Sequence, residues 1–572
     1  MNNSQLVPRI LSLTSRRALS TTRVAPELDP AMTTSEVPAK AASLTPNTSR
    51  SSTSSSLRAD TAPVTGGKPM LASQRAKEQQ RQTGEQPPAR RWFPLGYKES
   101  AQQWVSDTTM FRAPDSCLLT RPRQWTSVTA AAAERNVLLH VPILKEAVAG
   151  SLPDDDSSLL GQRVWKTQMV HLSGKNRALN EYSVERVGEK ADETLVMLHG
   201  YGAGLGLFYR NFEPLSRVKG WRLFALDMLG MGNSSRPDWK IHAKTREDKI
   251  TEAENWFVDS LEEWRRIRGI EKFTLLGHSL GGYLAVSYAI KYPGRLNKLI
   301  LASPVGIPED PYAVNAELPD PEDSTIASEF TDDQESIVSR TSSNAKTNPT
   351  RGPEKKAAAG KEEPPKRRPL PGWVVWAWDA NVSPFSLVRF AGPLGPSLVS
   401  GWTSRRFNHL PENERATLHT YAYNLFRQKG SGEYALPYLL APGAHARRPL
   451  IQRIHEVGRQ VLPPAAGADD GAPATRECGL PVVFMYGEND WMDVAGGLAA
   501  EVRIQRRIEQ ALAEATPDER RRENGSAKVL VVQKAGHHLY LDNPDDFNKM
   551  VQWEMEQTRS FERRRLRQGE AE

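Results

Sequence analysis

Residues 272–282 read KFTLLGHSLGG, and this stretch decides the fold. An apolar run, Phe273–Leu276, leads into the pentapeptide GHSLG centred on Ser279, and a helical pattern follows it. This is a G-x-S-x-G sequence in the order strand, sharp turn and helix. Such a turn lifts the serine hydroxyl above a sheet, and the helix N-terminus places positive potential beneath a developing anion. A chance turn is the alternative, but the context favours a nucleophilic Ser279.

Short apolar runs recur on both sides of this segment, and helical stretches separate them. The runs are TLVMLHG, WRLFALD, LNKLILASP, LPVVFMYG and AKVLVVQKAGH. The helical patterns cover Glu99–Val105, Ala130–Val137, Asp259–Ile267, Gly282–Lys291 and Glu501–Ala515. An alternating segment ahead of them, residues 164–187, predicts an antiparallel strand pair. The order predicts an α/β protein whose mostly parallel sheet is flanked by helices and buried on both faces.

Composition divides the rest of the chain. The 572 residues include 41 Pro and 40 Gly, which favours one large domain with a tail and insertions over several packed domains. The predicted order is a transit peptide (1–30), a disordered linker (31–90), the first part of the core (91–312), a disordered insertion (313–370), a helical lid (371–478), the second part of the core (479–560) and a basic tail (561–572).

The N-terminal segment has a distinct charge pattern. Four arginines precede its first acidic residue, Glu27, and it is rich in Ser and Thr. A basic, acid-poor, amphipathic start is typical of a mitochondrial transit peptide, and a disordered basic tail is the alternative. We therefore expect a mitochondrial location.

The net charge of +7 favours an anionic partner. No basic run with interleaved aromatics indicates a nucleic-acid module, so we predict an anionic lipid surface and no nucleic acid. No apolar run is long enough for a transmembrane helix. Aromatic residues are dense in the predicted lid, which indicates either an ordinary lid core or a lid that also contacts a membrane. In the second case Arg389, Arg405 and Arg406 are expected to meet anionic head groups.

A serine hydroxyl needs a base, and in this setting the chain order is serine, acid, histidine. His537 follows Gly536 just after the last apolar run, where it can reach back over Ser279. We predict His537 as the base, with His538 in reserve.

The acid is expected after the preceding strand, in the segment YGENDWMD. Asp490 lies in the turn after that strand and is predicted to accept the Nδ1–H of His537, which sets the tautomer of the ring. Asp493 is the alternative acid.

Acyl transfer also needs donors to the oxyanion that forms in the transition state. The loop HGYGAG, residues 199–204, follows a predicted strand. We predict the backbone N–H groups of Tyr201 and of Leu280, the residue after the nucleophile, as this pair. A plain Gly-rich turn is the alternative. No Gly-Lys-Ser/Thr follows and no Cys/His cluster has metal-ligand spacing, so we expect no cofactor and no metal.

These segments resemble an α/β-hydrolase subfamily that contains N-acylphosphatidylethanolamine lipase, the adipose-lipase coactivator and the yeast cardiolipin-specific deacylase. The resemblance lies in LHGYGAGLGLFYRNF, FALDMLGMGNSSRP, LLGHSLGGYLAVSYAIKYP, YGENDWMD and AGHHLYLDNPDDFN, among other segments. It covers residues 160–555 apart from the insertions. It implies an α/β-hydrolase fold with an inserted helical lid.

The transit-like start and YGENDWMD are most similar to the fungal mitochondrial branch. That similarity implies a serine phospholipase of the A type that converts cardiolipin to monolysocardiolipin, peripheral to the matrix side of the inner membrane. The subfamily also has a His-x-x-x-x-Asp motif linked to lysophospholipid acyltransfer, here His537 and Asp542, although Asp542 also fits a cap of the last helix. The coactivator branch lacks the serine, so Ser279 disfavours a non-catalytic lipid-binding regulator.

Overall fold

The computed structural model describes residues 99–101, 128–141, 163–309, 376, 378–442, 444–463 and 475–569. The predicted transit peptide (1–30), linker (31–90) and insertion (313–370) lie outside these residues, as does most of the pattern predicted over Glu99–Val105.

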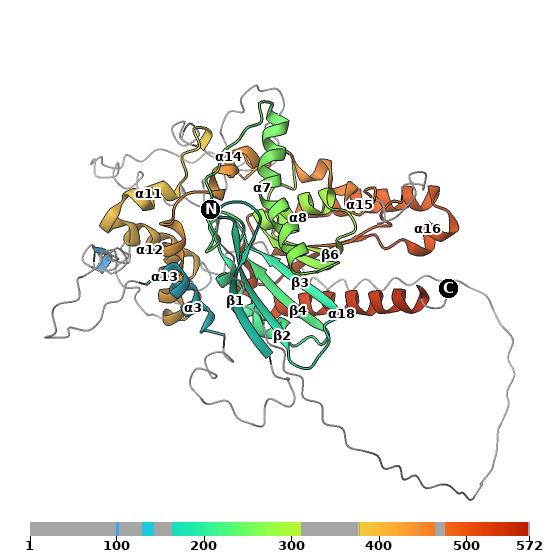
Figure 1. The fold of residues 1–572 in the computed structure, drawn as a ribbon, viewed down its shortest axis with the longest axis horizontal. Coiled ribbons are helices and arrows are strands. Elements are labelled where there is room, and N and C mark those ends of the chain that lie inside the picture. Colours follow the sequence, from blue (N-terminus) through green and yellow to red (C-terminus); the bar gives the residue numbers. More distant parts are fainter. Residues whose placement is uncertain are drawn as a thin grey trace, which may run out of the picture. The chain divides into compact units, whose positions relative to one another are not determined.

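The described strands form one sheet in the order β1-β2-β4-β3-β5-β6-β7-β8 (Figure 1). Their bounds are β1 Arg163–His171, β2 Ala178–Arg186, β3 Glu193–Leu198, β4 Trp221–Leu226, β5 Phe273–His278, β6 Leu296–Ala302, β7 Pro481–Gly487 and β8 Ser526–Val532. β1 and β2 pair antiparallel, as do β2 and β4, and all remaining pairs are parallel. The mostly parallel sheet and the antiparallel pair ahead of it are confirmed.

Helices cover both faces of this sheet. The described helices outside the segment between β6 and β7 are α3 (Ala130–Leu138), α6 (Tyr209–Leu215), α7 (Arg246–Ile267), α8 (Leu280–Lys291), α15 (Val494–Glu514), α16 (Pro517–Arg522), α17 (Leu539–Asp542) and α18 (Pro544–Gly569). Alternate side chains of β3 face opposite ways, as the period of a strand requires. Val196 and Leu198 pack with α7 and α8, whereas Leu195 and Met197 pack with α6 and α18.

Two helices begin earlier than their apolar patterns predict, because side chains cap them. Thr245 accepts the N–H of Asp248 at 3.2 Å, so α7 starts at Arg246. Asp493 accepts the N–H of Ala495 at 2.8 Å, so α15 starts at Val494. The boundary predicted at residue 561 falls inside α18.

The chain between β6 and β7 carries a group of short helices beside one end of the sheet (Figure 1). They are α11 (Phe385–Phe390), η2 (Gly392–Leu394), α12 (Gly395–Arg406), α13 (Glu412–Phe426), η3 (Gly432–Ala435), α14 (Leu436–Leu439), η4 (Leu450–Gln452) and η5 (Ile454–Glu456). We call residues 378–456 the lid. Helix α3 packs against α13, so a segment ahead of the sheet is joined to the lid. Among the described helices, none is both long and apolar enough to cross a bilayer.

Candidate active site

Ser279 occupies a strained turn between β5 and α8. Its backbone has φ 52° and ψ −114°, a conformation that costs a non-glycine residue on the order of 1–3 kcal/mol. Surrounding backbone bonds hold it there: the Ser279 N–H donates to the Ala302 carbonyl at 2.9 Å, and the Ser279 carbonyl accepts from Gly282 at 2.9 Å and Val305 at 3.2 Å.

The glycines of the pentapeptide are required sterically. A Cβ on Gly277 would lie 2.4 Å from the carbonyl oxygen of Gly281, and a Cβ on Gly281 would lie 2.7 Å from that of His199. Any side chain at either position would therefore push backbone apart. The turn around Ser279 has the form that the sequence predicts.

Asp490 and His537 meet beside this turn. The Nδ1 atom of His537 lies 3.2 Å from Oδ1 of Asp490, whose side chain is fully buried. The carboxylate is itself held, because its Oδ1 accepts the N–H of Met492 at 3.0 Å and its Oδ2 accepts the hydroxyl of Ser303. The carboxylate therefore stays aimed at the imidazole.

A second contact ties the His537 loop to the serine turn. His278, directly before Ser279, donates from Nε2 to the carbonyl oxygen of His537 at 2.9 Å, and the two rings lie 4.8 Å apart. Burial, with the neighbouring His537, holds the pKa of His278 well below its usual value, so its ring is neutral. The structure thus brings Ser279, Asp490 and His537 to one place.

The two alternatives make other contacts. Asp493 caps α15 through Ala495. His538 lies 5.2 Å from the ring of His278, but its nitrogens face the guanidinium of Arg406 at 3.3 Å rather than a carboxylate. Its ring also packs against that of Tyr540. Burial and Arg406 hold the pKa of His538 well below its usual value.

The predicted oxyanion donors flank the serine. A Cβ on Gly200 would lie 3.0 Å from the Cβ of Ser279, so the loop after β3 passes directly beside the nucleophile. Leu280 is the first residue of α8, where the N–H has no acceptor within the helix.

His199 orients the other donor. Its Nε2 accepts the N–H of Met228 at 3.1 Å, so the proton of the neutral ring is on Nδ1, which donates to the Gly200 carbonyl at 2.7 Å. Burial lowers the pKa of His199 and keeps this tautomer uncharged. In a planar trans peptide the N–H points opposite to the C=O. The Tyr201 N–H is therefore turned away from the His199 ring.

A family model described as "alpha/beta hydrolase fold" matches residues 193–544. The chain belongs to the α/β-hydrolase family. Its relatives include an Arabidopsis thaliana 1-acylglycerol-3-phosphate O-acyltransferase, 31% identical over 66% of this chain and 70% of that protein. A human (lyso)-N-acylphosphatidylethanolamine lipase is 30% identical over 68% of this chain and 86% of that protein. Human 1-acylglycerol-3-phosphate O-acyltransferase ABHD5 is 29% identical over 68% of this chain and 84% of that protein. The resemblance to the subfamily of N-acylphosphatidylethanolamine lipase and ABHD5 is confirmed, and the similarity to the fungal mitochondrial branch stays a prediction.

In this α/β hydrolase Asp542 has neither a capping role nor a contact with the nucleophile turn. Asn543 caps α18 instead, by accepting the N–H of Asp546 at 3.3 Å. Asp542 accepts the N–H of Gly536 at 2.8 Å and lies 3.4 Å from Nε2 of His409. The capping role predicted for Asp542 is thus taken by its neighbour, and Asp542 holds the loop that carries His537.

Sequence reasoning missed Ser303 in this hydrolase. It follows β6 in the segment LILASP and donates to the carboxylate of Asp490 from the neighbouring strand end. Its position could have indicated this contact, because Ser303 follows β6 and Asp490 follows the neighbouring parallel strand β7. The carboxyl ends of adjacent parallel strands meet at one edge of a sheet.

Aromatic side chains from the lid of the hydrolase pack against the loop that carries Tyr201. Phe385 stacks on Tyr201 at 5.0 Å and on Phe426 at 4.5 Å, and Trp402 packs against Phe426 at 5.2 Å. Within the described parts of the chain, no three His, Cys, Asp or Glu side chains converge in a way that would hold a metal ion.

Proposed function

We propose that this protein is a serine lipid hydrolase that removes one acyl chain from a phospholipid through an acyl-enzyme on Ser279. The observation that carries the proposal is the contact of 3.2 Å between His537 Nδ1 and Asp490 Oδ1, beside a serine held in a strained turn. A buried carboxylate on one imidazole nitrogen leaves the other nitrogen to act on the serine proton.

The chemistry follows from these positions. Oγ of Ser279 attacks the ester carbonyl while Nε2 of His537 takes its proton, and Asp490 stabilises the imidazolium. The backbone N–H groups of Tyr201 and Leu280 stabilise the oxyanion. When the intermediate collapses, the glycerol oxygen leaves with the proton from His537. Water then attacks the acyl-enzyme by the same route in reverse and releases the fatty acid.

A lipid substrate is supported by two observations. The relatives of this chain include a (lyso)-N-acylphosphatidylethanolamine lipase and a 1-acylglycerol-3-phosphate O-acyltransferase. The aromatic wall of Phe385, Phe426 and Trp402 beside Tyr201 is apolar, as acyl chains require. Within this class we propose cardiolipin, converted to monolysocardiolipin at the matrix side of the inner mitochondrial membrane. The basic, acid-poor first 30 residues and the net charge of +7 support that choice.

Access from a bilayer surface is supported by the lid. Large apolar side chains at and just before the lid are exposed to solvent, among them Phe390 at 88%, Trp376 at 70% and Leu387 at 65%. Arg389 does not join them as a head-group ligand, because Glu433 binds its guanidinium at 2.6 Å. Arg406 is also engaged within the protein, because its guanidinium packs over the ring of Trp402 and lies 3.3 Å from Nδ1 of His538. Arg405 is the residue for which we keep the proposed role.

A second candidate is lysophospholipid acyltransfer, in which a lysophospholipid hydroxyl replaces water in the second step. The observation in its favour is Asp542, six residues after Gly536, which shapes the loop of the proposed base. Adding lysophosphatidic acid or monolysocardiolipin to the assay separates the two reactions. Transfer converts the added acceptor to phosphatidic acid or cardiolipin, whereas hydrolysis releases free fatty acid and a lysolipid and leaves the acceptor without a new acyl chain.

The test is purified enzyme on vesicles of cardiolipin with phosphatidylcholine, with Ser279→Ala as control. We expect monolysocardiolipin from wild type and none from Ser279→Ala, and we expect binding to weaken as salt rises. Arg405→Glu is expected to reduce vesicle binding with little change in hydrolysis of a small soluble ester. Equal rates on cardiolipin and on pure phosphatidylcholine vesicles, with no response to salt, would instead indicate a general lipase.

A further inference from the structure

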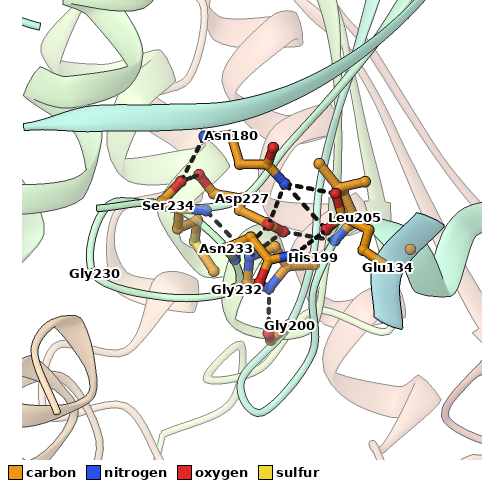
Figure 2. A network of polar contacts seen from close by, with 12 residues as sticks. Glu134, Asn180, His199, Gly200, Leu205, Asp227, Gly230, Gly232, Asn233 and Ser234 are labelled. Carbon is orange, nitrogen blue, oxygen red and sulfur yellow. Dashed lines mark hydrogen bonds and ion pairs between the residues drawn. The ribbon is translucent and has the colours of Figure 1, made fainter. Parts of the chain in front are cut away.

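The loop that carries Tyr201, residues 199–206, is held by groups from three separate parts of the chain; we call it the oxyanion loop. Inside it, His199 donates to the Gly200 carbonyl. The Leu205 N–H donates at 2.7 Å to Oδ1 of Asp227, which follows β4 (Figure 2). The Gly206 N–H donates at 3.2 Å to the hydroxyl of Tyr421, which comes from lid helix α13.

Asp227 is the centre of the network in Figure 2. Besides Leu205, its carboxylate accepts the N–H of Asn233 at 2.7 Å and the side-chain amide of Asn180 at 2.9 Å. The carboxylate is completely buried, so these donors take the place of water.

Glu134 is a second carboxyl group in the same network. It reaches in from α3 and is only 2% exposed. The Asn180 amide that binds Asp227 also lies 3.0 Å from both oxygens of Glu134, and the Asn233 amide lies 2.8 Å from one of them (Figure 2). The Tyr421 hydroxyl donates to that oxygen at 3.4 Å. A continuous path therefore runs from Gly206 through Tyr421 to Glu134.

Steric contact accompanies these bonds. A Cβ on Gly204 would lie 2.3 Å from the Tyr421 hydroxyl, and one on Gly206 would lie 3.0 Å from its ring. Gly202 is packed in the same way against Phe385 of α11. The oxyanion loop thus lies directly on lid side chains, and a shift of α13 must shift the loop.

The geometry points to Glu134 and Tyr421 as positioning residues that couple the lid to the oxyanion donor of Tyr201. This inference rests on the proposed function, since it assigns the loop a part in stabilising an oxyanion. The Tyr421 hydroxyl anchors the loop to α13, and Glu134 anchors Tyr421 to α3. When the lid is in the observed position, the Tyr201 N–H is held beside Ser279.

The protonation state of Glu134 makes the arrangement sensitive to pH. Burial, with the nearby charge of Asp227, raises the pKa of Glu134 to about 8. The other groups that face this cluster are Tyr421 on α13 and, beyond Asp227, His199 and Arg236. At neutral pH Glu134 is protonated, so Glu134 and Asp227 together carry one negative charge. Above that pKa the two buried carboxylates repel each other, which favours movement of Glu134 and α3 away from Asp227, although the bond from Tyr421 by itself favours the charged form of Glu134.

Tyr421→Phe removes the acceptor of the Gly206 N–H and keeps the ring. We expect kcat on a small soluble ester to fall about tenfold with KM nearly unchanged, because a displaced donor weakens binding of the transition state. The inhibition constant of a trifluoromethyl ketone, which forms an oxyanion on the serine, should rise by the same factor. Tyr438→Phe is the matched control, since this lid tyrosine packs on Trp239 away from the loop.

Glu134→Gln keeps the shape and the neutral state of the side chain. We expect kcat of the wild type to fall as pH rises, with an apparent pKa near 8. Glu134→Gln should not show this decline, because it has no proton to lose there. Because the folded protein holds this proton more tightly than the unfolded chain, wild-type stability should fall as pH rises from 4.5 to about 8, and the variant should show a flatter profile.

The outcomes separate this inference from the proposed function. If wild type neither hydrolyses esters nor reacts with a fluorophosphonate, the proposed function fails. If wild type is active but Tyr421→Phe leaves kcat and the ketone constant unchanged, the inference is wrong and the function stands. Suppose that Tyr421→Phe lowers kcat and the melting temperature and also changes KM, while Glu134→Gln keeps the wild-type pH profile. That result would show that both residues only stabilise the fold, and it would overturn the inference. A fall in kcat together with a matching rise in the ketone inhibition constant, at unchanged KM and melting temperature, supports it.

Discussion

Asp490→Asn tests which carboxylate serves His537. In the structure the carboxylate and the imidazole are 3.2 Å apart, and the Asp490 side chain is fully buried. Coulomb's law at an effective dielectric of about 20 gives about 5 kcal/mol between unit charges at that separation. At about 1.4 kcal/mol per tenfold change in rate, loss of this charge lowers kcat/KM by roughly 10³–10⁴-fold.

The orientation of the new amide adds to that loss. Two groups donate to Oδ1 of Asp490, the Met492 N–H and His537, so the oxygen of an asparagine is expected to stay on that side. If it flips instead, the NH₂ group donates to Nδ1 and forces the proton onto Nε2, where His537 can no longer accept from Ser279. Either orientation leaves the imidazolium without a counter-charge.

The control is Asp493→Asn. Asparagine caps a helix about as well as aspartate, so α15 should keep its start and activity should change less than about twofold. The assay is kcat/KM on a soluble ester, normalised by active-site titration with a fluorophosphonate. A crippled Asp493→Asn beside a nearly normal Asp490→Asn would refute the assignment of the acid.

Three further predictions concern the nucleophile, the lid and targeting. Ser279→Ala should abolish fluorophosphonate labelling. His537→Ala should lower kcat as much as Ser279→Ala does, because the nucleophile and its base act as a unit. Near-normal activity of either variant would contradict the mechanism. Phe390→Asp should lower partition onto cardiolipin vesicles by roughly 10- to 100-fold, since burying one large apolar side chain contributes roughly 1.5–3 kcal/mol. Trp553→Asp on α18, which is 57% exposed, is the matched control, and equal effects of the two would argue against contact through the lid. A chain lacking residues 1–30 should remain outside mitochondria in a fractionation assay, and normal import would refute the transit peptide.

The strand and helix order and the serine turn were predictable from sequence, because their causes are local. Apolar runs specify the strands, and the glycines beside Ser279 are required by backbone atoms a few residues away or on the adjacent strand end. The oxyanion loop was predictable for the same reason, since it follows the end of β3. The start of α15 was not, because an apolar pattern does not report the cap at Asp493.

Only the tertiary structure decided which side chains meet. Asp490 and Asp493 are three residues apart and chemically alike. Their roles differ because Asp490 contacts His537, which lies 47 residues further along the chain. Glu134 gave no sequence signal, because its partners Asp227 and Tyr421 lie far along the chain and its protonation depends on burial among them. Local sequence carries backbone preference and periodicity, whereas distance, burial and the electrostatics of a site arise only when distant segments pack together.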